Sequence, residues 1–191
     1  NRNEPDTSKH INLYLTLMTG GTPISVLNRT VPDDELTQFI AEHDCIKGVV
    51  LSENHNNSDT VAVAEVSAKY LKMMAQQGCY LVLTDIDRPG ANMMEKWFND
   101  TDTLYNAAKK YHQYLIINSK STTSSGFNTV RSFALGAWLG GLADNWGALT
   151  DAWTWYETGY HRIFSGINKV TYEDVRRVYT FPETLFAMNM L

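Results

Sequence analysis

Six short apolar segments recur along the chain at nearly even spacing, and they constrain the fold more than any other feature of the sequence. Successive segments begin about 35 residues apart, which is the length of one strand–helix unit in an alternating α/β fold. Apolar segments without strict alternation suit strands that are buried on both faces, as in a parallel sheet. The sequence therefore predicts a parallel α/β fold with strands at residues 11–17, 46–51, 79–83, 114–117, 146–149 and 184–188.

Two arrangements accommodate such units. A closed (β/α)8 barrel of the TIM type needs roughly 250 residues, whereas this chain has 191 and about six visible units, so it would be an incomplete segment of a longer barrel. The alternative is a complete open sheet with helices on both faces, for which the length is ample. The spacing leaves both open. In either case we expect one domain over residues 1–191, with no second domain.

Helices are expected between the apolar segments. The clearest covers residues 60–77, where apolar side chains recur at helical spacing and Gly78 follows as a stop signal. A very apolar helix at residues 127–143 carries Gly136, Gly140 and Gly141, and small residues spaced in this way let a helix pack closely against its neighbours. The remaining helices are expected at residues 32–43, at 92–111 with a break near Asn99, and at 170–179.

Composition and short motifs argue against several classes of function. The net charge of -5 and the absence of any run of Lys or Arg argue against nucleic-acid binding. No stretch of about 18 apolar residues exists, so we expect no membrane span, and no signal peptide is visible. The histidines lack metal-binding spacing, and we expect no metal and no cofactor. Cys45 and Cys79 begin two expected strands, as free thiols or as a disulfide.

Polar or acidic residues follow most of the apolar segments. In a parallel sheet the residues just past the carboxyl ends of the strands share one rim, where active sites gather. We expect five charged residues on that rim: Glu53, Asp85, Asp87, Lys120 and Asp151. Asp87 also begins an Asp-Arg-Pro-Gly sequence that is typical of a turn.

Glu53 and Asp151 are the best candidates for acid–base chemistry. Glu53 comes directly before the hydrogen-bonding residues Asn54 and His55. The alternative interpretation of Glu53 is a solvated residue at the end of a strand. Two carboxylates on one rim are the minimum needed to cleave a glycosidic bond, because one protonates the departing oxygen and the other activates water or attacks the sugar.

The residues after Asp151 strengthen this hypothesis. Trp153, Trp155 and Tyr156 follow it closely, and aromatic side chains of this kind can stack against sugar rings. The alternative interpretation of Asp151 is a helix N-cap, a position where Asp is favoured. Lys120 is a candidate for holding a substrate hydroxyl, and it is equally compatible with a solvated surface position.

Several segments, in their order along the chain, resemble the catalytic barrel of glycoside hydrolase family 98. They are residues 46–53, 79–85, 114–122, 134–147 and 181–183, and together they extend over nearly the whole chain. The resemblance implies a (β/α)8 barrel from secreted or cell-surface bacterial enzymes that cut inside complex glycans. The best-known members are endo-β-galactosidases acting on blood-group structures, and some relatives act on xylan.

The resemblance also implies an inverting mechanism and a set of site residues. By position the general acid falls on Glu53, and the base falls on Asp151 or, with a shifted alignment, on Asp144. Asn54, His55 and Lys120 would make polar contacts, and Trp153, Trp155 and Tyr156 would line the sugar subsites. The family pairs its base with a further Glu beyond the last strand, and this sequence ends at Leu191 before such a residue.

Three other readings stay open. The chain could belong to a non-catalytic glycan-binding protein on the same scaffold, or it could be an inert fragment of a barrel. It could also be an unrelated open-sheet enzyme whose acids bind Mg²⁺ or a phosphorylated ligand, although the sparse glycines make that less attractive. On the leading hypothesis the partner is an oligosaccharide or glycoconjugate substrate.

Overall fold

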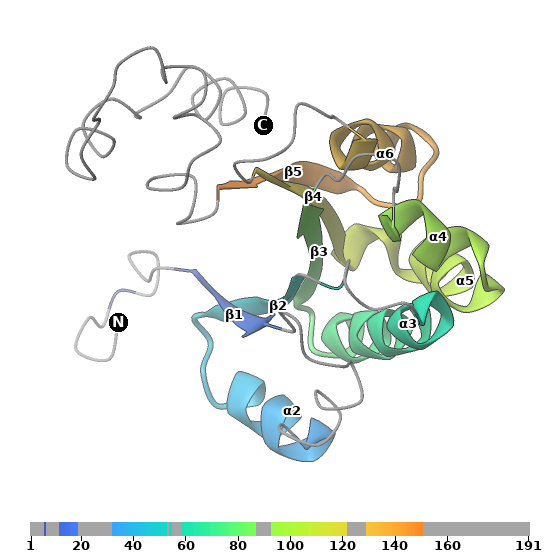
Figure 1. Ribbon diagram of the computed structural model, residues 1–191. Helices are drawn as coiled ribbons and strands as arrows, with labels where there is room; N and C mark the ends of the chain where they lie inside the picture. Colours follow the sequence, from blue (N-terminus) through green and yellow to red (C-terminus); the bar gives the residue numbers. More distant parts are fainter. Residues whose placement is uncertain are drawn as a thin grey trace, which may run out of the picture.

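The computed structural model describes Asp6 and residues 12–18, 32–52, 54, 59–86, 93–121 and 129–150. These residues form five strands connected by helices (Figure 1). The strands are β1 (Leu13–Met18), β2 (Ile46–Ser52), β3 (Tyr80–Ile86), β4 (Leu115–Ser121) and β5 (Asn145–Thr150). Each coincides with one of the first five predicted apolar segments within a few residues. The sixth segment, 184–188, and the expected helix at 170–179 lie outside the described residues.

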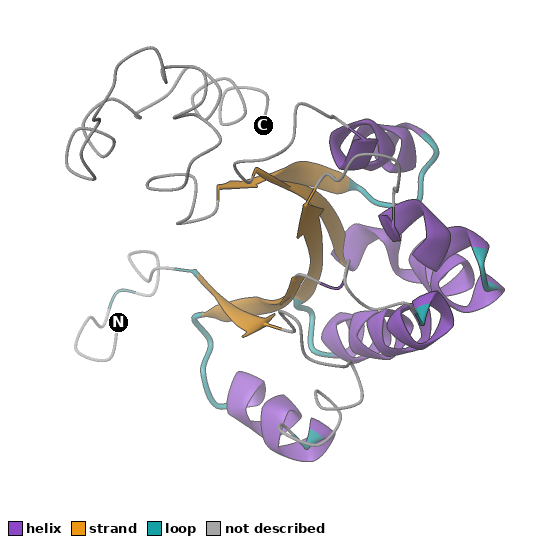
Figure 2. Cartoon of the chain, in the orientation of Figure 1, coloured by secondary structure: helices purple, strands orange, loops and turns teal. Residues whose placement is uncertain are grey.

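The five strands form one parallel sheet in the order β1-β2-β3-β4-β5. Every strand therefore pairs with its neighbour in the sequence, and the order does not reverse as it does in a doubly wound open sheet. Figure 2 shows a curved sheet with the helices along its convex side. This is the arrangement of a (β/α) barrel, left unclosed over the described residues. The alternative of an open sheet with helices on both faces was wrong.

The helices lie close to their predicted positions. The longest, α3 (Thr60–Gln76), begins where the Asp59 carboxylate accepts a hydrogen bond from the Ala62 N–H at 2.9 Å, and it ends before Gly78, whose φ is 65°. The predicted break near Asn99 separates two helices, with Thr101 capping the second. The other helices are α2 (Asp33–Ala41), α4 (Met93–Asn99), α5 (Asp102–Tyr111) and α6 (Thr129–Leu139), with a short 3-10 turn η3 (His112–Tyr114).

Alternate residues of the strands face opposite sides of the sheet. One set packs with the helices in a single hydrophobic core, and it includes Val49, Leu51, Leu81, Leu83, Leu115 and Ile117. Val50 and Val82 are also buried but lie outside that core cluster. They occupy the alternate positions and so face the other side, which we call the concave face. In a barrel this face is the interior.

Tyrosines occupy the concave face near the amino ends of the strands. Tyr14, Gly48 and Tyr80 are register partners across β1, β2 and β3. A Cβ atom on Gly48 would lie 2.2 Å from the Tyr80 carbonyl oxygen and 2.9 Å from the Tyr14 ring. Burial, reinforced by the nearby Tyr80 and Cys79, raises the pKa of the Tyr14 hydroxyl. Gly48 is thus required because the Tyr80 backbone oxygen, and then the Tyr14 ring, occupy the space that a side chain would need.

The two cysteines lie next to this end of the sheet, one before β2 and one before β3, as predicted. Both are free thiols, so the alternative of a disulfide was wrong. The Cys79 sulfur lies 3.6 Å from the carbonyl oxygen of Ile46, and burial raises the pKa of this thiol.

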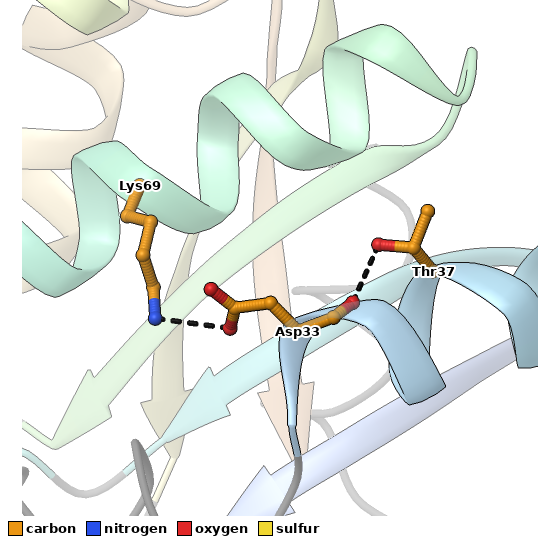
Figure 3. Close-up of polar contacts among 3 residues, drawn as sticks. All are labelled: Asp33, Thr37 and Lys69. Atoms are coloured by element: carbon orange, nitrogen blue, oxygen red, sulfur yellow. Dashed lines mark hydrogen bonds and ion pairs between the residues drawn. The ribbon is translucent and has the colours of Figure 1, made fainter.

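On the helix side, an ion pair connects α2 to α3 (Figure 3). Lys69 Nζ donates to Asp33 Oδ1 at 3.0 Å, and the Thr37 hydroxyl donates to the Asp33 backbone carbonyl at 2.6 Å. An open cavity of about 560 Å³ lies between the two helices, with Met73 among its lining residues. Both charged groups are largely solvated, so the pair contributes at most about 1 kcal/mol.

The prediction that Gly136 serves close helix packing was wrong. Gly136 is exposed on α6, and a Cβ atom built there meets nothing within 4 Å. The apolar residues Leu135, Trp138 and Leu139 on the same helix are also exposed.

Candidate active site

Three small polar residues line up at the carboxyl end of the sheet. Ser52 of β2 is the register partner of Thr84 of β3, and Thr84 is the partner of Asn118 of β4. The next residue across, Gly147 of β5, completes the row without a side chain. Adjacent strands are about 4.8 Å apart, so these side chains follow one another at that interval. We call Ser52, Thr84 and Asn118 the polar row.

The polar row belongs to the concave face. Ser52 and Thr84 come two residues after Val50 and Val82, and two residues along a strand restore the same face. Ser52 and Thr84 are 3% and 0% exposed, whereas Asn118 is partly exposed. From the amino end to the carboxyl end, the concave face therefore changes from tyrosine through valine to small polar side chains.

Two atoms of the polar row are buried without a hydrogen-bond partner among the described residues. They are the Thr84 hydroxyl oxygen, Oγ1, and the Asn118 side-chain carbonyl oxygen, Oδ1. A hydroxyl both donates and accepts hydrogen bonds, and an Asn amide carries one accepting and two donating positions. Together these groups match the chemistry of a ligand that is rich in hydroxyl groups.

Described residues lie on both sides of Glu53 in the sequence. β2 ends at Ser52, and Asn54 two residues later is 2% exposed. Asp59 caps α3, and the Thr60 hydroxyl donates to the Asp100 carboxylate between α4 and α5.

Most of the predicted site residues lie outside the part of the chain that the structure describes. These are Glu53, His55, Asp87, Asp151, Trp153, Trp155 and Tyr156. Asn54 is described and buried, and for Lys120 the structure gives the backbone position within β4, as the partner of Leu149. The ends of two strands are nevertheless informative, since β2 ends at Ser52, directly before Glu53, and β5 ends at Thr150, directly before Asp151.

Asp85 lies at the expected rim but on the helix side of the sheet. It follows Leu81 and Leu83 in the alternation of β3, it is 1% exposed, and its register partner Ser119 is equally buried. A carboxylate in this row is suited to holding the connection between strand and helices. It does not face the polar row, so we do not count it among the catalytic candidates.

Asp144 lies at the opposite end of the sheet from the polar row. It directly precedes β5, its backbone N–H donates to the His112 carbonyl oxygen at 3.1 Å, and its carboxylate lies 2.6 Å from His112 Nδ1. The strand from Asn145 to Thr150 is about 20 Å long. An inverting pair has its two carboxylates about 6.5–9.5 Å apart, so Asp144 could not pair with an acid located at the carboxyl end of the sheet.

Thr84 and Asn118 were not among the site residues predicted from the sequence. Their neighbours in sequence are apolar or charged. The charged neighbours Asp85 and Lys120 were predicted to lie at the site instead. The available signal was the alternation along β3 and β4. Leu83 and Ile117 are core residues that face the helices. The residue directly after each of them, Thr84 or Asn118, therefore lies on the opposite face.

Two further observations concern the described residues alone. None of their helices combines the length with the apolar character that a membrane crossing requires. Within the same residues, no three His, Cys, Asp or Glu side chains come together as possible metal ligands.

Comparison with known proteins gives one family for the whole chain. A family model described as "Glycosyl hydrolase family 98" matches residues 2–191. Among curated proteins, a blood-group-substance endo-1,4-beta-galactosidase of Clostridium perfringens is 29% identical over 196 residues, which cover 100% of this chain and 24% of that protein. The chain thus spans about a quarter of the length of this relative.

Solved structures of a family 98 catalytic module from Streptococcus pneumoniae TIGR4 are also similar. The native form has a TM-score of 0.63 at 30% identity, covering 78% of this chain and 25% of that one. The complex with the H-disaccharide blood group antigen has a TM-score of 0.69 at 28% identity, covering 96% and 31%. The complex with the LewisY pentasaccharide antigen has a TM-score of 0.66 at 27% identity, covering 95% and 30%.

Proposed function

This chain belongs to glycosyl hydrolase family 98, and from that membership we propose that the protein containing it cleaves internal β-galactosidic linkages in blood-group-type or related glycans. The observation that carries the proposal is the family match over residues 2–191. It is supported by the curated relative, a blood-group endo-β-galactosidase aligned over the entire chain. The similar structures that hold blood-group antigens point to the same class of substrate.

We further propose an inverting mechanism with Glu53 as general acid and Asp151 as general base. Glu53 gives its proton to the glycosidic oxygen as the bond to the anomeric carbon breaks. Asp151 removes a proton from a water molecule that attacks the same carbon from the opposite face of the ring. The ends of β2 and β5, which directly precede these two residues, support the pairing because both are carboxyl ends of one parallel sheet.

The remaining candidates are proposed to hold the glycan around the scissile bond. Trp153, Trp155 and Tyr156 would stack against sugar rings, while His55 and Lys120 would bind hydroxyl groups. Asn54, which is buried next to Glu53 in sequence, would orient the acid or a substrate hydroxyl from behind. No cofactor is part of this mechanism.

A glycan-release assay on the full-length protein tests the proposal. Blood-group A, B and H-type oligosaccharides are incubated beside xylan, and the anomeric form of the first product is read by NMR. We expect release of a defined oligosaccharide with inverted configuration. Positioned acid–base groups contribute about 10²–10⁴-fold, so Glu53→Gln and Asp151→Asn should each lower kcat by roughly that factor.

Two outcomes would count against the proposal in different ways. A product with retained configuration would contradict the inverting mechanism while leaving the hydrolase in place. No release from any substrate by a folded protein that still binds the glycans would favour the non-catalytic glycan-binding protein. In that case Glu53→Gln would leave both cleavage and affinity unchanged.

We also propose that the protein acts outside the cell, secreted or on the cell surface, because blood-group glycans are extracellular. Fractionation of the producing cells tests this, and recovery of the whole protein from the cytoplasmic fraction would refute it.

A further inference from the structure

We propose that Thr84 and Asn118 form the floor of the sugar subsite at the scissile bond and bind hydroxyl groups of the ring held there. The proposal rests on the proposed function, since it deepens the same site. Neither residue was among the candidates that the sequence supplied. Three features support the proposal: the strand order, the face of the sheet on which the residues lie, and the chemistry of two buried oxygen atoms.

Thr84 and Asn118 lie on the two strands between β2 and β5, the strands that directly precede the proposed catalytic carboxylates in sequence. Glu53 follows β2 and Asp151 follows β5, and the two strands between them are β3, which carries Thr84, and β4, which carries Asn118. A sugar ring that is protonated from one side and attacked from the other must lie over these middle strands. Thr84 and Asn118 are register partners about 4.8 Å apart, a spacing comparable to the width of one pyranose ring.

The two residues lie on the face of the sheet that is opposite the helices. Helices cover the convex side, and the core residues Leu83 and Ile117 point to it. Thr84 and Asn118 each follow one of these core residues, so they face the concave side. Asn118 is partly exposed, whereas its Oδ1 atom is buried and Thr84 is 0% exposed, so a ring bound there would have to contact the row at β4.

The chemistry of the two side chains completes the argument. Buried polar atoms are nearly always hydrogen-bonded, and leaving one without a partner costs about 1–3 kcal/mol. Among the described residues, no group bonds to Thr84 Oγ1 or Asn118 Oδ1. The two atoms lie on neighbouring strands, on the same face as the buried Val50 and Val82. Sugar hydroxyl groups bound there would supply the missing hydrogen-bond partners.

The test compares Thr84→Val, which replaces the hydroxyl by a methyl group of similar shape, with Thr84→Ser, which retains the hydroxyl. It uses the full-length protein and three readouts. These are the Tm without ligand, kcat/KM on the blood-group oligosaccharides, and affinity for the H-disaccharide antigen in a Glu53→Gln background. Asn118→Ala is measured beside Ser119→Ala, a buried neighbour on the same strand that faces the helices.

We expect Thr84→Val to leave the Tm unchanged or to raise it, because it removes a buried hydroxyl that the protein itself does not satisfy. The same variant should lose roughly tenfold in kcat/KM and in affinity, while Thr84→Ser keeps most of both. Asn118→Ala should lose at least as much, and Ser119→Ala should lower the Tm with kcat/KM unchanged.

The opposite pattern would overturn the inference. If Thr84→Val and Asn118→Ala lower the Tm and leave kcat/KM and affinity unchanged, the partners of these atoms lie within the protein. If the wild type cleaves no glycan, the proposed function fails and the affinity measurement decides the inference alone. A tenfold loss of affinity in Thr84→Val would then support a binding floor, and unchanged or absent binding would refute it.

Discussion

At the amino end of the concave face the ring of Tyr14 lies against Gly48 beside Tyr80, whereas four residues further along the strands the same face carries Ser52, Thr84 and Asn118. At the first end the Tyr14 ring lies over a bare backbone and is itself 41% exposed. The second end has small side chains with buried polar atoms. One sheet face therefore combines an end where a ring lies directly against the backbone with an end that carries hydrogen-bonding atoms without a partner among the described residues.

The difference separates stability from function along a single set of strands. In barrels of this type, residues at the carboxyl ends carry the chemistry, and residues at the amino ends contribute to stability. A substitution at the amino end should change the free energy of unfolding and leave kcat of the folded protein unchanged. A substitution at the carboxyl end should change kcat by more than its effect on stability would suggest.

The largest effect is expected for Gly48→Ala at the amino end. A Cβ atom there would lie 2.2 Å from a backbone oxygen in the middle of the sheet, so the strands must move apart, at a cost of about 3 kcal/mol or more. Urea unfolding should show a large loss, with kcat of the remaining folded protein unchanged. Gly136→Ala is the matched control, because that position is open and helical, and it should stabilise by about 0.5–1 kcal/mol. Equal effects of the two substitutions would contradict the packing argument.

A smaller effect is expected at alkaline pH, also from the amino end. Burial raises the pKa of Cys79, so the folded thiol keeps its proton after the unfolded thiol has lost it, above about pH 8.5. The free energy of unfolding should therefore fall as the pH rises from there towards the folded pKa. Cys79→Ala should cost about 1 kcal/mol at neutral pH and should flatten this dependence. An unchanged slope between pH 7 and pH 10 in urea unfolding of the variant would rule out this thiol as the cause.

The positions of the elements could be predicted from the sequence because they follow from local patterns. The apolar face of α3, with Val63, Tyr70 and Met74, is visible as helical spacing, and the break near Asn99 coincides with a capping residue, Thr101. The strands were visible as apolar runs. These features depend on a few neighbouring residues, and the structure confirms them.

The pairing of residues between elements could not be predicted in the same way. Whether Thr84 lies beside Asn118 depends on the register between strands that are 34 residues apart in sequence (118 minus 84), and no local pattern determines it. Gly136 was misassigned because its spacing does not show that its side of α6 is exposed. The roles of Glu53, Asp151 and the aromatic residues after it stay predictions, since they lie outside the described residues.

A moderate effect is expected for Asp59→Ala at the carboxyl end. The Asp59 carboxylate accepts the Ala62 N–H at the start of α3, and losing such a cap costs about 1 kcal/mol. Because Asp59 ends the segment that carries Glu53, we also expect kcat to fall severalfold at a temperature where the protein stays folded. Asp59→Asn should retain the cap and most of both properties. A loss of stability with unchanged kcat would contradict the expected difference between the two ends, since the carboxyl end would then affect stability alone, like the amino end.

The smallest effect is expected for Asp144→Asn, and it distinguishes the two candidate bases. Asp144 contacts His112 in an ion pair at the amino end, with both side chains almost half exposed, and such a pair contributes less than about 1 kcal/mol. We expect a small change in Tm, measured at low salt, and unchanged kcat. Asp151→Asn should instead abolish most of the activity without a comparable change in Tm. A large loss of kcat in Asp144→Asn would place the base at the wrong end of β5, and the assignment of chemistry to the carboxyl ends would have to be abandoned.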